Sequence, residues 1–415
     1  NTMKKGLLLA LVVVMAGAAV LGAQEGPPPP PEGLTFSGSV ITGLRYRSYV
    51  GGTGYDVFDI DAGDDYLVEG DTAALRGTLN KGTYGANFEV KLNANNTGAN
   101  FWTAARIYTS EASLWANLLD NKVGIKAGYF GDFDYFTPVL AYSLGPDGGT
   151  DAIQLTAYPI DGLRIDVRTR NSASNLSVGE FSAPVWYKGE QYIKNIDGGV
   201  KYTNPSFTTF VALDNTWKAA GPAPDETTQT DIFGYVAYTG VPKLTVSLEG
   251  KFFDVTSERK DSADATKDLG ITIATAINAS YQITDVFSAR AWFIAGAGGI
   301  GGSLFDFGTF ADKTKNLLGE DGFSFAVDTE FTYKLSDTVT FSLRPIFQIP
   351  DSEKMDIFDI SVKPKVAWAL ASFPYAATIN FWYMLRVYGK DGVAYAGNNN
   401  EALNHSIAAT FGWTF

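Results

Sequence analysis

The feature that most constrains this chain is a two-residue alternation of apolar and polar side chains, which dominates the sequence from Leu34 onward. In residues 323–335 one parity is apolar and rich in aromatics, as at Phe325 and Phe331, whereas the other parity carries Asp328 and Glu330. Successive side chains of a strand point to opposite faces, so the pattern predicts strands with one apolar face and one ionic face. Residues 338–349, 358–370 and 379–388 repeat the pattern.

The length of these strands separates two all-β architectures. A secreted β-sandwich would also alternate, but its strands usually have about 5 or 6 residues. The runs in this sequence reach the about 9 to 11 residues that cross a bilayer. Ionic residues at strand centres, opposite aromatic ones, fit a barrel with lipid outside and water inside. We therefore predict an all-β chain that forms a transmembrane antiparallel up-and-down β-barrel.

Short turns that alternate with longer polar segments predict the strand count. Eight hairpins, a first strand at 34–49 and a last strand at 402–415 give about 18 strands, with both termini on the periplasmic side. A count of 16 stays open, because Arg106 breaks the parity of segment 101–118. The predicted turns are Lys81–Gly82, Asp120–Asn121, 160–162, Asn204–Pro205, 240–242, Thr284–Asp285, Ser336–Asp337 and 372–374. Aromatic residues beside them, predicted to form an interfacial girdle, are Tyr84, Tyr202, Phe207, Tyr281, Phe287, Tyr333 and Tyr375.

The N-terminal segment predicts export from the cytoplasm. Lys4 and Lys5 precede an apolar run from Leu7 to Leu21 that ends in small residues, which is typical of a cleaved signal peptide at residues 1–23. Residues 24–33 contain a run of prolines that predicts an extended periplasmic spacer. The barrel is then predicted to occupy residues 34–415.

The composition argues against catalysis and against nucleic acid. One histidine and no cysteine leave few ligands for metal, iron–sulfur or disulfide chemistry, and the net charge of −13 would repel phosphates. Residues 296–301 match G-x-G-x-x-G, but no helix pattern follows them to bind a pyrophosphate. We therefore expect no enzyme activity, no cofactor, no metal and no nucleic-acid partner.

The C-terminal residues resemble the terminal strand of bacterial outer-membrane proteins. Phe411, Trp413 and Phe415 occupy alternate positions, and in such proteins this pattern is read by the barrel-assembly machinery. With the leader, the alternation and the turns, the mature chain resembles general porins, and more weakly the porin-like proteins of spirochaetes. The resemblance implies a homotrimer in the outer membrane of a diderm bacterium, with lipid, assembly machinery, periplasmic chaperones and small hydrophilic solutes as partners.

The resemblance also implies a constriction, because general porins fold their third outer loop into the barrel. The corresponding segment here is 131–150, with Asp132 and Asp134 expected to face the pore. Strand parity predicts more basic than acidic residues on the inner wall. Near neighbours such as Arg164 and Asp166 are expected to pair, whereas the arginine ladder of Arg164, Arg168 and Arg170 on one strand is expected to lack matching acids as a whole. The basic residues expected to line the pore are Arg45, Arg47, Arg76, Arg164, Arg168, Arg170, Arg344, Lys363 and Arg386.

These features predict a water-filled channel for passive diffusion of small hydrophilic solutes, with a mild preference for anions. Two alternatives remain open from the sequence. In one, the barrel anchors a surface structural protein or adhesin. In the other, aromatic residues form a sugar-specific track, which requires a bulge in segment 101–118 to bring all of them inward. The track residues are Trp102, Trp115, Trp292 and Trp382.

Overall fold

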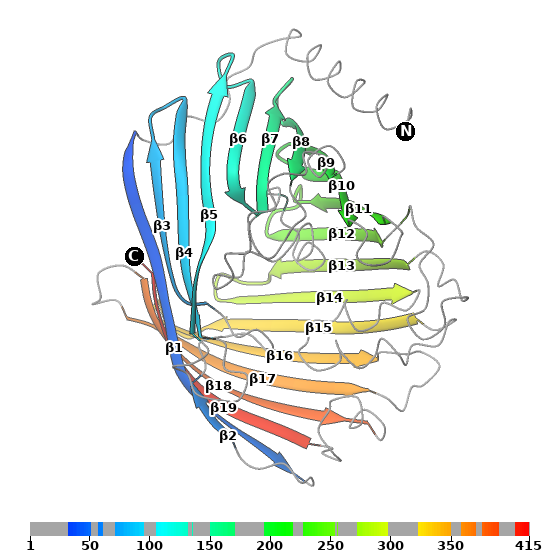
Figure 1. Ribbon diagram of the computed structural model, residues 1–415. Helices are drawn as coiled ribbons and strands as arrows, with labels where there is room; N and C mark the ends of the chain where they lie inside the picture. The colour runs from blue at the N-terminus through cyan, green and yellow to red at the C-terminus, as the bar shows by residue number, and fades with distance from the viewer. Residues whose placement is uncertain are drawn as a thin grey trace.

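The computed structural model describes residues 32–50, 57–60, 71–94, 105–131, 135, 150–170, 195–218, 227–253, 255, 272–297, 323–349, 358–370, 376–389 and 403–414. These residues form one antiparallel sheet closed into a barrel, with no helix among them (Figure 1). No helix in the described part is long and apolar enough to cross a membrane. The strands of the first half are β1 (Gly33–Val50), β2 (Val57–Ile60), β3 (Asp71–Asn80), β4 (Tyr84–Ala94), β5 (Ala105–Leu118), β6 (Val123–Phe130), β7 (Thr150–Ala157), β8 (Leu163–Arg170), β9 (Ile196–Thr203) and β10 (Phe207–Lys218). The remaining strands are β11 (Thr227–Tyr238), β12 (Leu244–Phe253), β13 (Thr272–Gln282), β14 (Phe287–Ala297), β15 (Phe323–Lys334), β16 (Val339–Ile349), β17 (Asp359–Ala369), β18 (Ala376–Tyr388) and β19 (Leu403–Thr414).

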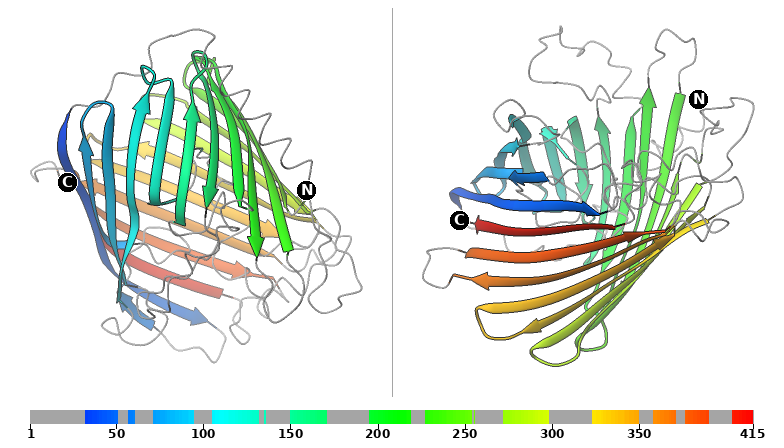
Figure 2. Two further views of the ribbon diagram at one scale, coloured as in Figure 1. Left: turned by 45° about the horizontal axis from the view of Figure 1, so that its top comes forward. Right: turned by 90° about the horizontal axis from the view of Figure 1, so that it is seen from below.

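The ring closes between its first and last strands. β1 pairs with β19 over Ser39–Val50, and its other edge pairs with β3 over Gly33–Val40. The short strand β2 pairs with Leu44–Arg47 of β1, beyond the end of β3, and is an addition to the ring. β3 to β19 follow one another as consecutive neighbours, and Figure 2 shows β1 beside β19. The barrel formed by the described residues therefore has 18 strands, which confirms the predicted count and not the alternative of 16.

Burial confirms that apolar residues face outward and ionic residues inward. On β12, Leu248 is 49% exposed on the outer face, whereas the neighbouring Glu249 is 1% exposed on the inner face. The girdle residues Tyr84, Phe207, Tyr281 and Tyr333 are exposed on the outer face beside the turns. Most strands repeat this arrangement, so the alternation in the sequence sets most of the residues that line the inside of the barrel. β10 and β11 differ, because they carry Phe210 and Phe233 on the inner face.

Seven of the eight predicted short turns lie at strand breaks in the described residues, and the eighth, 372–374, lies outside them. The β5–β6 turn places Asp120 at φ 54° and Asn121 at φ 65°, which Asp and Asn tolerate better than most residues. Gly162 has φ 74°, and a Cβ built there would lie 2.1 Å from the Thr203 carbonyl oxygen. A side chain at Gly162 would therefore clash with the backbone of the next hairpin.

A β-bulge on β5 explains the broken parity of segment 101–118. Glu89 on β4 pairs with Glu111, but the next residue, Val90, pairs with Thr109, so that Ser110 is left over. The extra residue shifts the side-chain alternation by one position.

Residues 1–31, and with them the predicted signal peptide and most of the predicted spacer, lie outside the described residues, as do Trp102, Tyr375 and Phe415.

Candidate functional site

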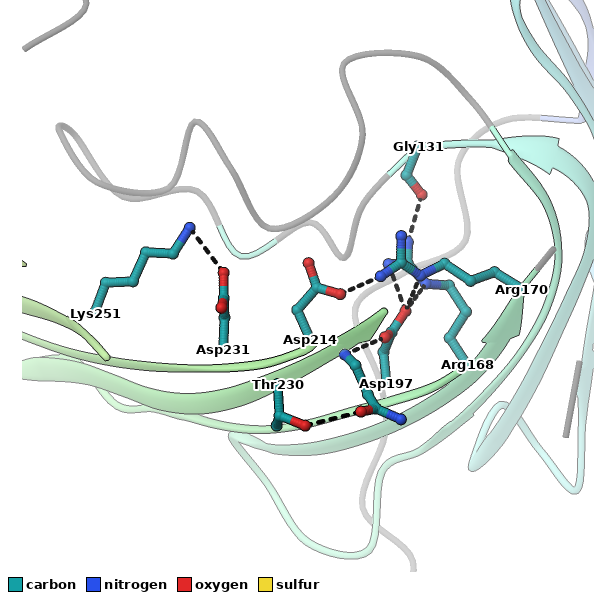
Figure 3. Close-up of polar contacts among 9 residues, drawn as sticks. Gly131, Arg168, Arg170, Asp197, Asp214, Thr230, Asp231 and Lys251 are labelled. Atoms are coloured by element: carbon teal, nitrogen blue, oxygen red, sulfur yellow. Dashed lines mark hydrogen bonds and ion pairs between the residues drawn. The ribbon is translucent and has the colours of Figure 1, made fainter. Parts of the chain in front are cut away.

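The inner wall formed by β7–β12 contains a buried network of ion pairs centred on Asp197 of β9. Arg168, which is 1% exposed, donates to Asp197 Oδ2 from Nε at 3.0 Å and from Nη2 at 2.8 Å. Arg170 forms ion pairs with the same carboxylate, at 2.9 Å, and with Asp214 of β10 (Figure 3). The other oxygen of Asp197, Oδ1, accepts the Asn215 backbone N–H at 3.0 Å.

Arg164 belongs to the same ladder and is also matched, because its Nε lies 2.8 Å from Asp166 Oδ2. The predicted pair of Arg164 with Asp166 is confirmed, whereas the prediction that the ladder lacks acidic partners is wrong for Arg168 and Arg170. The partners come from β8, β9 and β10, so pairing depends on which strands are neighbours in the ring. Arg164, Arg168 and Arg170 lie where parity placed them, but their charge is largely balanced by carboxylates.

The chain segment after β6 turns inward onto this network. The Gly131 carbonyl accepts a hydrogen bond from Arg168 Nη1 at 2.9 Å. Tyr135 is buried, and its hydroxyl donates to Asp166. Burial and the nearby Asp166 carboxylate raise the pKa of the Tyr135 phenol, which therefore stays protonated as the donor. The expected constriction segment thus contacts the inner wall at Gly131 and Tyr135, while Asp132 and Asp134 lie outside the described residues.

The Tyr135 ring packs on an aromatic patch of the inner wall. Its centroid lies 5.2 Å from that of Phe210, and Phe233 belongs to the same buried cluster. A Cβ built on Gly199 would lie 2.5 Å from the Tyr135 ring, so the absence of a side chain on β9 leaves room for it. The inward Phe210 and Phe233 of β10 and β11 are thus packed against Tyr135, a residue from another part of the chain.

The aromatic patch explains why the sequence did not predict two acidic residues of the inner wall. Asp214 and Asp231 are opposite each other on β10 and β11, both face inward, and Lys251 Nζ lies 3.3 Å from Asp231. Their strands carry apolar residues on both faces, as at Phe210 and Val211, so the inward parity has no clear polar signature. The excess of basic over acidic residues on the inner wall is smaller than predicted because these two acids belong to it.

The β3–β6 wall carries a second group of pairs. Arg76 Nε donates to Glu89 Oε2 at 2.7 Å, and Lys91 Nζ lies 3.5 Å from Glu89 Oε1. Lys126 Nζ lies 2.8 Å from Glu111 Oε1. Arg45 and Arg47 occupy positions on β1 that pair with Ala408 and Ser406, whose own side chains are buried; the two arginine side chains lie outside what the structure describes.

The β14–β18 wall combines ion pairs with two buried tryptophans. Arg290 Nη2 lies 2.5 Å from Glu330 Oε2, and Arg344 Nη2 lies 2.7 Å from Asp328 Oδ2. Arg386 Nε donates to Asp359 Oδ2 at 2.8 Å. Lys363 Nζ lies 4.5 Å from the centroid of the Trp382 ring, a cation–π distance. Arg344, Lys363 and Arg386 thus lie on one wall, apart in sequence from the arginines of β8.

The C-terminal strand carries its aromatic residues on the outer parity. Phe411 and Trp413 share the parity of Ile407, which is exposed on the outer face, while Ala408 and Thr410 are buried on the inner face. Trp413 is opposite Val40 of β1 and Ala377 of β18, so it lies beside the seam where the ring closes.

The arrangement as a whole is the fold of a bacterial outer-membrane porin: a closed antiparallel ring with an apolar outer face and an ionic inner face. Solved structures of bacterial outer-membrane proteins share this fold. OccAB1 of Acinetobacter baumannii superposes with a TM-score of 0.54 at 13% identity, covering 92% of this chain and 96% of that chain. The outer membrane protein opdK of Pseudomonas aeruginosa gives 0.53 at 10% identity, covering 92% and 99%. OpdQ of the same species gives 0.53 at 12% identity, covering 93% and 99%.

The likeness to these structures is one of fold, because the sequences are so different. No protein-family model matches the sequence. No curated protein matches it either.

Proposed function

We propose that the chain is an outer-membrane porin, a water-filled channel through which small hydrophilic solutes diffuse passively. One observation carries the proposal: the described inner walls of β3–β6, β7–β12 and β14–β18 bear ionic side chains, whereas the outer face is apolar. Charged groups on an inner face are stable only where water or matched charges surround them, and a solvated lumen provides both. The likeness in fold to outer-membrane porins supports the same function.

We further propose that the channel prefers anions mildly. The support comes from the β14–β18 wall, because the acids of β7–β12 match the arginine ladder. Strand charges bias which ions pass a pore. On that wall the described cationic side chains outnumber the acidic ones: Arg290, Lys334, Arg344, Lys363, Lys365 and Arg386 against Asp328, Glu330 and Asp359.

The test of both proposals is a planar-bilayer recording of the purified, refolded protein in a potassium chloride gradient. We expect stepwise ohmic openings, because a permanently formed pore conducts without activation. The reversal potential should have the sign for chloride preference over potassium. A folded barrel that never conducts would reject the channel and favour a surface anchor, whereas a clear potassium preference would reject only the anion preference.

The remaining parts of the proposal follow the resemblance to porins. We propose that Phe411 and Trp413, on the outer face of β19, contribute to recognition by the barrel-assembly machinery, and that Phe415 belongs to the same signal. Periplasmic chaperones, a homotrimeric assembly and periplasmic termini are part of this proposal. Crosslinking of the protein in native membranes would report the oligomer directly.

A further inference from the structure

We infer that the wall of β13–β15 holds a binding site for a neutral polyhydroxylated solute, such as a monosaccharide, centred on Asn278 and Trp292. This inference rests on the proposed channel function, because the site faces the lumen. Asn278 and Trp292 are opposite each other on β13 and β14, and each is 5% exposed.

Each of the two residues carries a polar atom that is buried and has no hydrogen-bond partner among the described residues. The atoms are Asn278 Oδ1 and Trp292 Nε1. Nε of the nearby Arg290 is likewise buried without a partner among the described residues. An unsatisfied buried polar group costs about 1–3 kcal/mol. Along the same strands the inward neighbours on one side, Ala276 and Ile294, are apolar, whereas Arg290 on the other side is charged. Two unsatisfied polar groups side by side at this boundary indicate a ligand that satisfies both groups.

The donor and acceptor pattern identifies the class of ligand. The indole Nε1–H and Arg290 Nε–H donate, whereas Asn278 Oδ1 accepts. A hydroxyl group accepts one hydrogen bond while it donates another, so two neighbouring hydroxyls match all of these groups together. A carboxylate or inorganic anion offers acceptors only, and would leave the Asn278 oxygen unmatched.

The electrostatics of the site favour a neutral solute as well. Arg290 is paired with Glu330 at 2.5 Å and Arg344 with Asp328 at 2.7 Å, so the formal charges beside Trp292 balance. The two guanidinium groups lie 3.6 Å and 5.6 Å from the Trp292 ring centroid. The Arg290 and Arg344 side chains are 41% and 23% exposed, so they border the indole on the side that faces the lumen. A solute would reach the indole by displacing long arginine side chains rather than backbone.

The experiment measures the ion current through wild-type channels in symmetric potassium chloride while D-glucose is added. We expect a saturable decrease of the current, superimposed on the linear effect of viscosity. Trp292→Phe keeps an aromatic ring but removes the N–H, and Asn278→Leu removes the acceptor at similar size. Each variant is expected to raise the half-saturating glucose concentration by up to about tenfold, the equivalent of one neutral hydrogen bond. Trp368→Phe, on the outer face of β17, is the matched control and should behave as wild type.

The outcomes separate this inference from the proposed function. Channels that conduct without any saturable effect of glucose would overturn the inference, since water alone would then fill the site, and would leave the porin intact. Block by D-glucuronate at least tenfold stronger than by glucose would also overturn it, because the site would then select for charge. A protein that gives no openings before sugar is added would fail at the level of the proposed function instead.

Discussion

Replacing Asp197 with asparagine is expected to lower the free energy of unfolding of the barrel by about 3–5 kcal/mol, the usual result of removing one partner from buried ion pairs. Asp197 holds Arg168 with two hydrogen bonds and Arg170 with an ion pair, and all three side chains are buried. The amide would leave two buried guanidinium groups without their shared negative charge. Arg170 keeps Asp214, so most of the loss falls on Arg168.

The measurement is equilibrium unfolding in urea after refolding into lipid vesicles. The folded fraction is read from the gel mobility of unheated samples, in which folded barrels migrate differently from the unfolded chain. Asp285→Asn is the matched control. Asp285 and Lys243 form an exposed pair at 2.9 Å between neighbouring turns, and their bond lowers the pKa of Asp285 and raises that of Lys243. Because the pKa of Asp285 is lowered in the folded state, any stabilisation of the fold by this pair is present above the ordinary pKa of an aspartate. That stabilisation is lost as the pH falls through the lowered pKa. Exposed pairs contribute little, so this variant should unfold as wild type does. Equal stability of Asp197→Asn and wild type would mean that the network is not structural.

Replacing Tyr135 with phenylalanine is expected to increase the rate of current fluctuations through open channels by about tenfold or more. The Tyr135 hydroxyl donates to the Asp166 carboxylate, and a hydrogen bond to a charged group contributes about 1.5–3 kcal/mol. Asp166 keeps Gln154 at 3.0 Å, Thr156 at 2.6 Å and Arg164 at 2.8 Å, so its carboxylate remains satisfied. The lost hydrogen bond therefore weakens the attachment of Tyr135 to the inner wall and leaves β8, which carries Asp166, as it is.

Tyr135→Ala removes the packing on Phe210 as well and should have the larger effect, accompanied by faster proteolysis within residues 131–150. The control is Tyr281→Phe, which loses a hydroxyl on the outer face of β13. The measurements are single-channel recordings at fixed voltage and timed digestion of the reconstituted protein. Unchanged noise and unchanged digestion in Tyr135→Ala would show that this residue does not hold the segment in place.

The sequence predicts those parts of the barrel that depend on local pattern. Long alternating runs predict the strands and their inward faces, and dipeptides such as Asp120–Asn121 predict the hairpins, because both effects act within a few residues. The prediction fails where distant parts of the chain meet. Arg168 acquires its partner from β9, and the bulge at Ser110 is set by pairing with β4. Asp214 and Asp231 were missed because inward aromatics beneath Tyr135 remove the polar signature of their strands.

The pairing of β1 with β19 also constrains the order of assembly. These two strands are the farthest apart in the sequence. Even so, twelve residues of β1 pair with twelve residues of β19 in one register, from Ser39 opposite Thr414 to Val50 opposite Leu403. Contacts of such long sequence separation form slowly, because the loop entropy is lost before the contact is gained. Until β19 arrives, the backbone groups along one edge of β1 have no strand to pair with. A nascent chain is therefore exposed to edge-to-edge aggregation for the whole time that the intervening strands are being delivered, and a binding partner that shields this edge would raise the yield of closed barrels.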